Sequence, residues 1–287
     1  RHDEMSVTKS NLYSAFGEAR ANARGLVFGG DREMKQFTAF IKKEFLEQVR
    51  SGRFMILGIL FCLFGIMNPA TAKMLPWLFE IMSEQLAENG MLITGIEVDA
   101  LTSWTQFFKN MPILLIVFIV MFSSILTTEY QKGTLINVIT KGMKRWKILV
   151  SKLLIMSVFW TAGYVITFGI TYGYNAYFWD NHIVQNLFFA AFGYYLVGLW
   201  LISTVLLASV ALRSASAVTI FVGAAFVSSY LLSFFPVFRE YVPTFILSSN
   251  ELMMGVVDSS QCFASVGITI FLTALKGGLA VLFFISE

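Results

Sequence analysis

Apolar residues gather along the chain in six long runs, separated by shorter polar stretches. The runs cover residues 54–70, 111–128, 148–174, 187–212, 215–235 and 264–285. A helix needs about 20 mostly apolar residues to cross the ~30 Å hydrocarbon core of a bilayer. None of the runs shows the alternation of apolar and polar residues that is typical of membrane strands. The pattern therefore predicts an all-α polytopic membrane protein with six transmembrane helices.

The segment before the first run has a helical periodicity of its own. Between residues 35 and 50, charged side chains fill one face and apolar side chains the other. This pattern is typical of a helix at the membrane surface, with its basic residues facing anionic headgroups. We interpret the segment as an interfacial amphipathic helix; the alternative is a charged flank that only sets the topology. Its apolar face consists of Phe37, Phe40, Ile41, Phe45 and Val49.

Residues 1–33 differ from the rest, because they are polar and have no helical stripe. We interpret them as a tail outside the transmembrane domain of residues 34–287. Two origins stay open: a native tail, or a segment translated from upstream of a start at Met34.

Three polar segments between the runs carry structural signals. Residues 76–90 and 97–110 are acidic and partly amphipathic, which predicts short helices on the outer surface. Residues 235–255 contain Pro236 and Pro243 and are too polar to span a membrane. They are either a re-entrant or interfacial hairpin protected by protein, or an ordered external loop.

Composition supports the membrane assignment. Of 287 residues, 56% are hydrophobic and 14% are charged, whereas a soluble domain carries roughly 25% charged residues. The net charge of +3 is too small to argue for nucleic acid. Two cysteines, Cys62 and Cys262, lie in or beside apolar runs and indicate neither a disulfide framework nor a metal site.

Loop charges predict the orientation. Lys and Arg concentrate before the first run, between the second and third, and after the fourth, whereas the other loops are mainly acidic. Because short basic loops stay in the cytoplasm, both termini are expected there. We expect a multi-pass membrane protein with its N- and C-termini in the cytoplasm.

The basic connection after the second run has features that topology alone does not require. Glu129 lies at the membrane boundary, where an acidic group is costly unless it is paired or hydrated. Gly133 and Thr134 permit a turn and a helix cap. Leu135, Val138 and Ile139 then share one face of a short helix. The alternative is an ordinary positively charged loop.

The arrangement Glu129-Tyr-Gln-Lys-Gly133-Thr134-Leu135, followed by Lys144-Arg145, resembles the ABC-2 type permeases, the membrane subunits of bacterial ABC exporters. The resemblance extends from Met34 through the interfacial helix, the long first external loop and the six runs. It implies that the segment after the second span is a coupling helix that docks on a separate ATPase, with the interfacial helix nearby. The coupling residues implied are Glu129, Gly133, Thr134, Leu135, Lys144 and Arg145.

The resemblance also implies a location in the bacterial cell membrane, and it implies partners. These are an ABC ATPase subunit that binds ATP and Mg²⁺, a second permease copy or a sister permease to form a dimer, and membrane lipid. This chain lacks the Walker A pattern, the HExxH motif and a nucleophile elbow, so we expect no catalytic site and no cofactor of its own. Two other hypotheses are an ATP-independent carrier or channel and a membrane-embedded maturation enzyme. Both need polar groups well inside the spans, and few are present.

Lys276 is the exception, because it interrupts the sixth run. A lysine at mid-bilayer costs a few kcal/mol on insertion scales. It could face a substrate path or a subunit interface, snorkel to the surface, or mark an altered sequence.

Overall fold

The computed structural model describes residues 34–87, 98–140 and 142–286, and none of these residues forms a strand. A helix over residues 34–50 comes first. The further elements are α2 (Arg53–Ala87), α3 (Ala100–Phe122), α4 (Ser124–Lys132), α5 (Thr134–Thr140), α6 (Arg145–Phe178), η1 (Asn181–Ile183), α7 (Leu187–Ala211), α8 (Ala215–Leu232), α9 (Pro236–Arg239), η2 (Pro243–Leu247), α10 (Ser249–Met253), η3 (Ser259–Cys262) and α11 (Phe263–Ser286).

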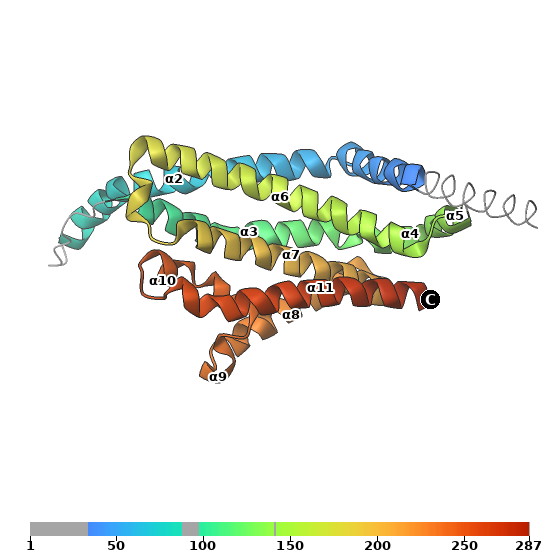
Figure 1. Cartoon of the computed structure of the whole chain (residues 1–287). Coiled ribbons are helices and arrows are strands. Elements are labelled where there is room, and N and C mark those ends of the chain that lie inside the picture. Colours follow the sequence, from blue (N-terminus) through green and yellow to red (C-terminus); the bar gives the residue numbers. More distant parts are fainter. Residues whose placement is uncertain (1–33, 88–97, 141, 287) are drawn as a thin grey trace, which may run out of the picture.

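The long helices lie side by side in one bundle (Figure 1). Within the described residues, six helices are long and apolar enough to cross a membrane, which confirms the predicted number. Helix α2 packs against α6 and α3, and α7 packs against α11, α6 and α8. Most of α7 is buried, whereas few residues of α8 and α11 are buried, as expected for helices whose outer faces contact lipid.

The first span is longer than the apolar run that predicts it. Helix α2 continues without interruption through Pro69 and Pro76 to Ala87. The predicted separate surface helix over residues 76–90 is therefore wrong as far as Ala87, and residues 88–90 lie outside the described part. Proline removes one backbone donor but leaves the rest of the helix intact when neighbouring helices support it. The polar composition after Pro76 thus marks where α2 leaves the apolar layer, not where the helix ends.

The second span also starts earlier than predicted. Asp99 caps α3, since the backbone N–H of Thr102 donates to Asp99 Oδ1 over 2.9 Å. The segment over residues 97–110 is therefore not a separate surface helix: from Ala100 onward it forms the first turns of α3. Ser123, which keeps right-handed helical backbone angles, separates α3 from α4, and the two together form one candidate span over Ala100–Lys132.

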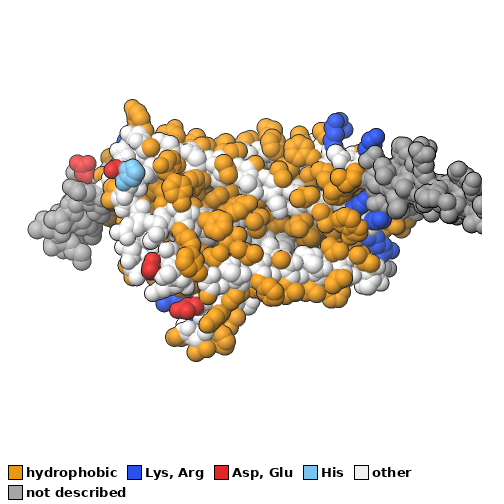
Figure 2. Space-filling model, viewed as in Figure 1, with side chains coloured by type: hydrophobic (Ala, Val, Ile, Leu, Met, Phe, Trp, Pro, Cys, Tyr) orange, Lys and Arg blue, Asp and Glu red, His pale blue; other side chains and the backbone are white. Residues whose placement is uncertain are grey.

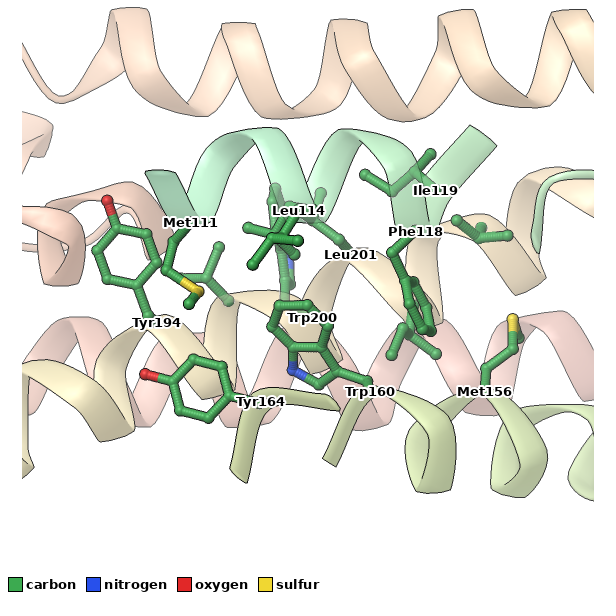
Figure 3. Packing of buried hydrophobic residues seen from close by; sticks show 14 of the residues in the cluster. Met111, Leu114, Phe118, Ile119, Met156, Trp160, Tyr164, Tyr194, Trp200 and Leu201 are labelled. Carbon is green, nitrogen blue, oxygen red and sulfur yellow. The ribbon is translucent and has the colours of Figure 1, made fainter. Parts of the chain in front are cut away.

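The core lies where α3, α6 and α7 meet. Figure 3 shows Met111, Leu114 and Phe118 of α3 facing Trp160 and Tyr164 of α6. The Trp160 ring lies 6.0 Å from Phe61 and 5.5 Å from Phe118, measured between ring centroids. Its Nε1–H donates to the carbonyl oxygen of Tyr195 over 3.2 Å. Trp160 is thus fixed by contacts with three helices.

Gly198 of α7 permits the close approach of Trp160. A Cβ at this position would lie 2.2 Å from Cε2 of the Trp160 ring. We therefore expect Gly198→Ala to destabilise the fold by about 1–3 kcal/mol, because the ring has no room to move. Thermal unfolding in detergent micelles measures the effect. Gly169→Ala is the matched control, since a Cβ there would meet nothing within 4 Å; equal stability of the two variants would contradict the packing argument.

The two ends of the bundle carry different charges (Figure 2). The end formed by residues 34–50, α4, α5 and the end of α11 is named the basic end, and the end with α10 is named the acidic end. Asp180, Glu240, Glu251 and Asp258 belong to the acidic end. Residues at the basic end include Lys35, Lys42, Lys43, Arg50, Lys132, Lys144, Arg145 and Lys147.

Residues 242–253 pack against the helices at the acidic end, whereas residues 235–241 are exposed. Helix η2 packs on α7, α8 and α11, and its residues Pro243–Ile246 are buried. The hydroxyls of Ser229 and Thr244 are 3.1 Å apart, and Ser265 Oγ donates to the carbonyl oxygen of Val242. These contacts show that the second half of the segment is ordered and packed, which both predicted alternatives require.

Lys276 finds its contacts within the chain. Its Nζ donates to Thr204 Oγ1 over 2.7 Å and lies 4.0 Å from the centroid of the Trp200 ring. A cation over an indole face is stabilised by roughly 0.5–2 kcal/mol. The lysine therefore links α11 to α7 without a carboxylate partner among the described residues.

Candidate functional site

The connection between α4 and α6 has the local structure that its glycines predict. Gly133 ends α4 with φ 65°, a left-handed conformation that glycine adopts without strain. Helix α5 follows at once, which confirms the predicted short helix. Gly142 then has φ 84°, and α6 begins at Arg145. Lys144 is the extended N-cap residue of α6 and is exposed.

Helix α5 has one packed and one open face. Leu135 is buried, and Val138 and Ile139 are partly buried against the core, as the predicted stripe requires. Ile136 lies outside that stripe, and 65% of it is exposed. Thr134 is also exposed. A short helix that presents a large apolar side chain at the end of a bundle can bind another protein.

A cavity of about 340 Å³ lies between α4, α5, α6 and α11 at the basic end. Four of the predicted coupling residues line it: Glu129, Gly133, Leu135 and Arg145. Thr134 and Lys144 lie outside the lining. The guanidinium of Arg145 donates to the carbonyl oxygen of Phe284 over 3.3 Å, so the start of α6 holds the last turn of α11.

Glu129 belongs to a buried ionic cluster. Lys152 Nζ of α6 lies 3.0 Å from Glu129 Oε1 and 3.1 Å from Glu44 Oε2 of the N-terminal helix. It also donates to the carbonyl oxygen of Ile125 over 3.1 Å. An ammonium group has three donors, so all three are used. Only 1% of the Lys152 side chain is exposed, and charges so buried persist only when paired.

A second set of hydrogen bonds runs beside the cluster. Arg53, the first residue of α2, donates to Gln48 Oε1 over 2.9 Å and to Ser124 Oγ over 2.7 Å. These bonds join α2 to the N-terminal helix and to α4. Both sets together are named the ionic junction, which joins four helical segments through Glu44, Gln48, Arg53, Ser124, Glu129 and Lys152.

One carboxylate oxygen of the junction accepts no hydrogen bond from the described residues. Glu129 Oε2 is buried and has no hydrogen-bond partner among the residues that the structure describes. Because Glu129 lines the cavity, this carboxylate belongs both to the junction and to the cavity wall. Buried polar atoms are normally satisfied, so an unsatisfied one next to a cavity indicates a place where another group can bind.

The N-terminal helix contacts the rest of the chain through a face that its apolar stripe covers only in part. Phe40 is buried and Phe37 and Ile41 are partly buried, but 37% of Phe45 and 36% of Val49 are exposed. The buried stripe continues instead through two polar residues, Glu44 and Gln48.

The same helix also runs along α6 (Figure 1). The aromatic rings of Phe37 and Trp146 are 6.3 Å apart, and those of Phe45 and Phe159 are 5.7 Å apart. With 34 residues, α6 is about 51 Å long, well above the ~30 Å of the hydrocarbon core, so its ends extend past that core. The N-terminal helix lies beside one of these ends.

Sequence reasoning found Glu129 but not its partners. Lys152 stands near the start of the third apolar run, where topology alone accounts for basic residues, and Glu44 has no signal in an apolar pattern. The available signal was indirect: Phe40, Glu44 and Gln48 recur every four residues, as side chains on one helix face do.

Comparison with known proteins relates the chain to a family and to a bacterial membrane protein. A model of the family described as "ABC-2 family transporter protein" matches residues 38–243, a range that includes the whole ionic junction. An uncharacterized transmembrane protein of Bacillus subtilis (strain 168), YxlG, is 26% identical over 230 residues, which cover 76% of this chain and 84% of that protein.

Proposed function

Because the chain belongs to the ABC-2 family of transporter proteins, we propose that it is the permease subunit of an ABC exporter, driven by ATPase subunits on separate chains. The family membership makes it a multi-pass membrane component of a transporter. The observation that supports ATPase coupling is the ionic junction, since it ties the exposed α4–α5 connection to the spanning helices. The substrate crosses through this chain and its permease partner.

The basic end is the docking surface in this proposal. Ile136 of α5 enters an apolar depression of the ATPase, while the basic side chains around it meet acidic residues. A donor from the ATPase bonds to Glu129 Oε2, the oxygen that lacks a partner in the described part of the chain. In this proposal the basic end lies in the cytoplasm of a bacterial cell, as the distribution of Lys and Arg favours.

In this proposal the ionic junction transmits the closure of the ATPases to the spanning helices. ATP and Mg²⁺ bind to the ATPases and close them, which displaces α5 and with it α4. Lys152 holds Glu129 of α4 and Glu44 of the N-terminal helix at once, so α6 and that helix move with α4. Coupling of this kind requires only contiguous packed groups with two arrangements. The driving energy is the difference in ATP affinity between the two states.

A dimer completes the transporter, either of two copies or of this chain with a sister permease. The test is co-expression of the tagged chain with an ABC ATPase encoded in the neighbouring gene. We expect both to co-purify and the ATPase rate to depend on the permease. An ATPase that never co-purifies, together with export that continues when its Walker lysine is replaced, would contradict the proposal.

A further inference from the structure

The acidic end contains a groove that neither the family match nor the coupling proposal explains. Two cavities of about 470 and 430 Å³ lie there, within the size range of sites for small organic molecules. They share Tyr230, Leu247, Ser248 and Glu251 in their walls, so they form one groove. Its walls come from α3, α7, α8 and the segment from α9 to α10.

One cation in the wall of the groove has no carboxylate partner among the described residues. Arg239 and Glu251 pair with each other over 3.0 Å, and the Arg239 guanidinium lies 4.9 Å from the centroid of the Phe245 ring. Lys109 is exposed and has no ion-pair partner among the described residues. The groove therefore has an excess positive charge at its α3 side, where an anionic group can bind.

The apolar part of the groove lies beside that cation. Phe108 and Pro112 of α3 and Phe226 of α8 line the same cavity as Lys109. Tyr230 also lines it, and 48% of this residue is exposed. Lys109 comes two residues before the uncharged stretch that starts at Met111, and Tyr230 lies in the last turn of α8. Tyr and Lys at span ends mark the membrane–water boundary. The groove thus opens at headgroup level.

From this placement we infer that the groove binds an amphipathic molecule with one anionic group, which meets Lys109 while its apolar body lies against Phe226 and Tyr230. As a substrate site it rests on the proposed export function, and it names the substrate class. Two sources share this chemistry: an amphiphile in transit and an anionic phospholipid of the membrane.

Photolabelling tests the site without any ATPase, so its failure is distinguishable from failure of the export proposal. The chain in phosphatidylcholine nanodiscs is irradiated with a long-chain fatty acid that carries a diazirine, or with the corresponding alcohol. Labelled positions are found by mass spectrometry. We expect the carboxylate probe to label α8 near Tyr230 and residues 247–251, and the alcohol to label them about fivefold less, as for one partly exposed ion pair.

Variants make the result specific. Lys109→Gln is expected to lower carboxylate labelling by about fivefold, and Lys109→Arg to keep it. Lys73→Gln is the matched control, because Lys73 is exposed and contacts the ring of Phe178 rather than the groove. Labelling that is unaffected by Lys109→Gln, or spread evenly over α2 and α11, would overturn the inference. If added phosphatidylglycerol competes with the probe, the site belongs to membrane lipid. If it does not compete, the site belongs to an amphiphile in transit.

Discussion

Replacing Lys152 with methionine is expected to lower the free energy of unfolding by about 3–5 kcal/mol, the usual cost of removing one partner from a buried ion pair. Glu129 would lose the cation 3.0 Å from its Oε1, and Glu44 would keep only Lys43, 3.1 Å from its Oε1. Methionine fills similar space, so the loss would come from charge rather than from a cavity. Unfolding by SDS in mixed micelles, followed by circular dichroism, measures it.

Two further variants separate charge from packing in this experiment. Lys132→Met removes an exposed lysine at the end of α4 and is expected to leave stability within about 0.5 kcal/mol. Adding Glu129→Gln to Lys152→Met should recover part of the loss, because a neutral amide needs no cation. If Lys152→Met unfolds at the wild-type SDS concentration, the junction does not hold the four segments together.

Replacing Ile136 with aspartate is expected to reduce co-purification of the ATPase by at least about tenfold, the effect of losing a central apolar contact of an interface. The side chain is 65% exposed on α5, so the fold itself should be little affected. Thermal unfolding of the purified chain checks that point, and the yield of bound ATPase per permease measures the interaction.

The matched control for this experiment is Ile183→Asp. Ile183 belongs to η1 near the acidic end and is 55% exposed, so the chemistry of the change is the same and only the place differs. It should leave ATPase binding unchanged. Equal losses in both variants would mean that insertion or folding is impaired, and would remove α5 from the docking surface.

Much of the fold could be predicted from the sequence. A run of about 20 apolar residues has few alternatives to a spanning helix, because backbone groups in lipid must bond within their own segment. The short helix α5 was equally predictable, since two glycines, Gly133 and Gly142, flank it in the sequence. In the structure both glycines have positive φ. The predicted spans were too short where polar residues follow the run, as in α2 beyond Pro76, because helical structure does not stop at the edge of the apolar layer.

The candidate site was only half predictable. Glu129 stood out because an isolated acid at a membrane boundary needs a partner. Its partner, Lys152 of α6, also pairs with Glu44, and that second contact depends on which face of the N-terminal helix turns inward. For a helix beside lipid, apolar side chains such as Phe45 and Val49 lose nothing by facing outward. The polar Glu44 and Gln48 turn inward because they pair with Lys152 and Arg53. These pairings become visible only once the fold is known.

The central claim, that energy enters through the basic end from a separate ATPase, is tested most directly by site-specific photo-crosslinking. A benzoylphenylalanine residue is introduced in place of Ile136 in one variant and Ile183 in another, and each chain is co-expressed with the ATPase in cells. Our account predicts a permease–ATPase crosslink from position 136 only. A crosslink from position 183, or from neither position while the ATPase still co-purifies, would contradict it.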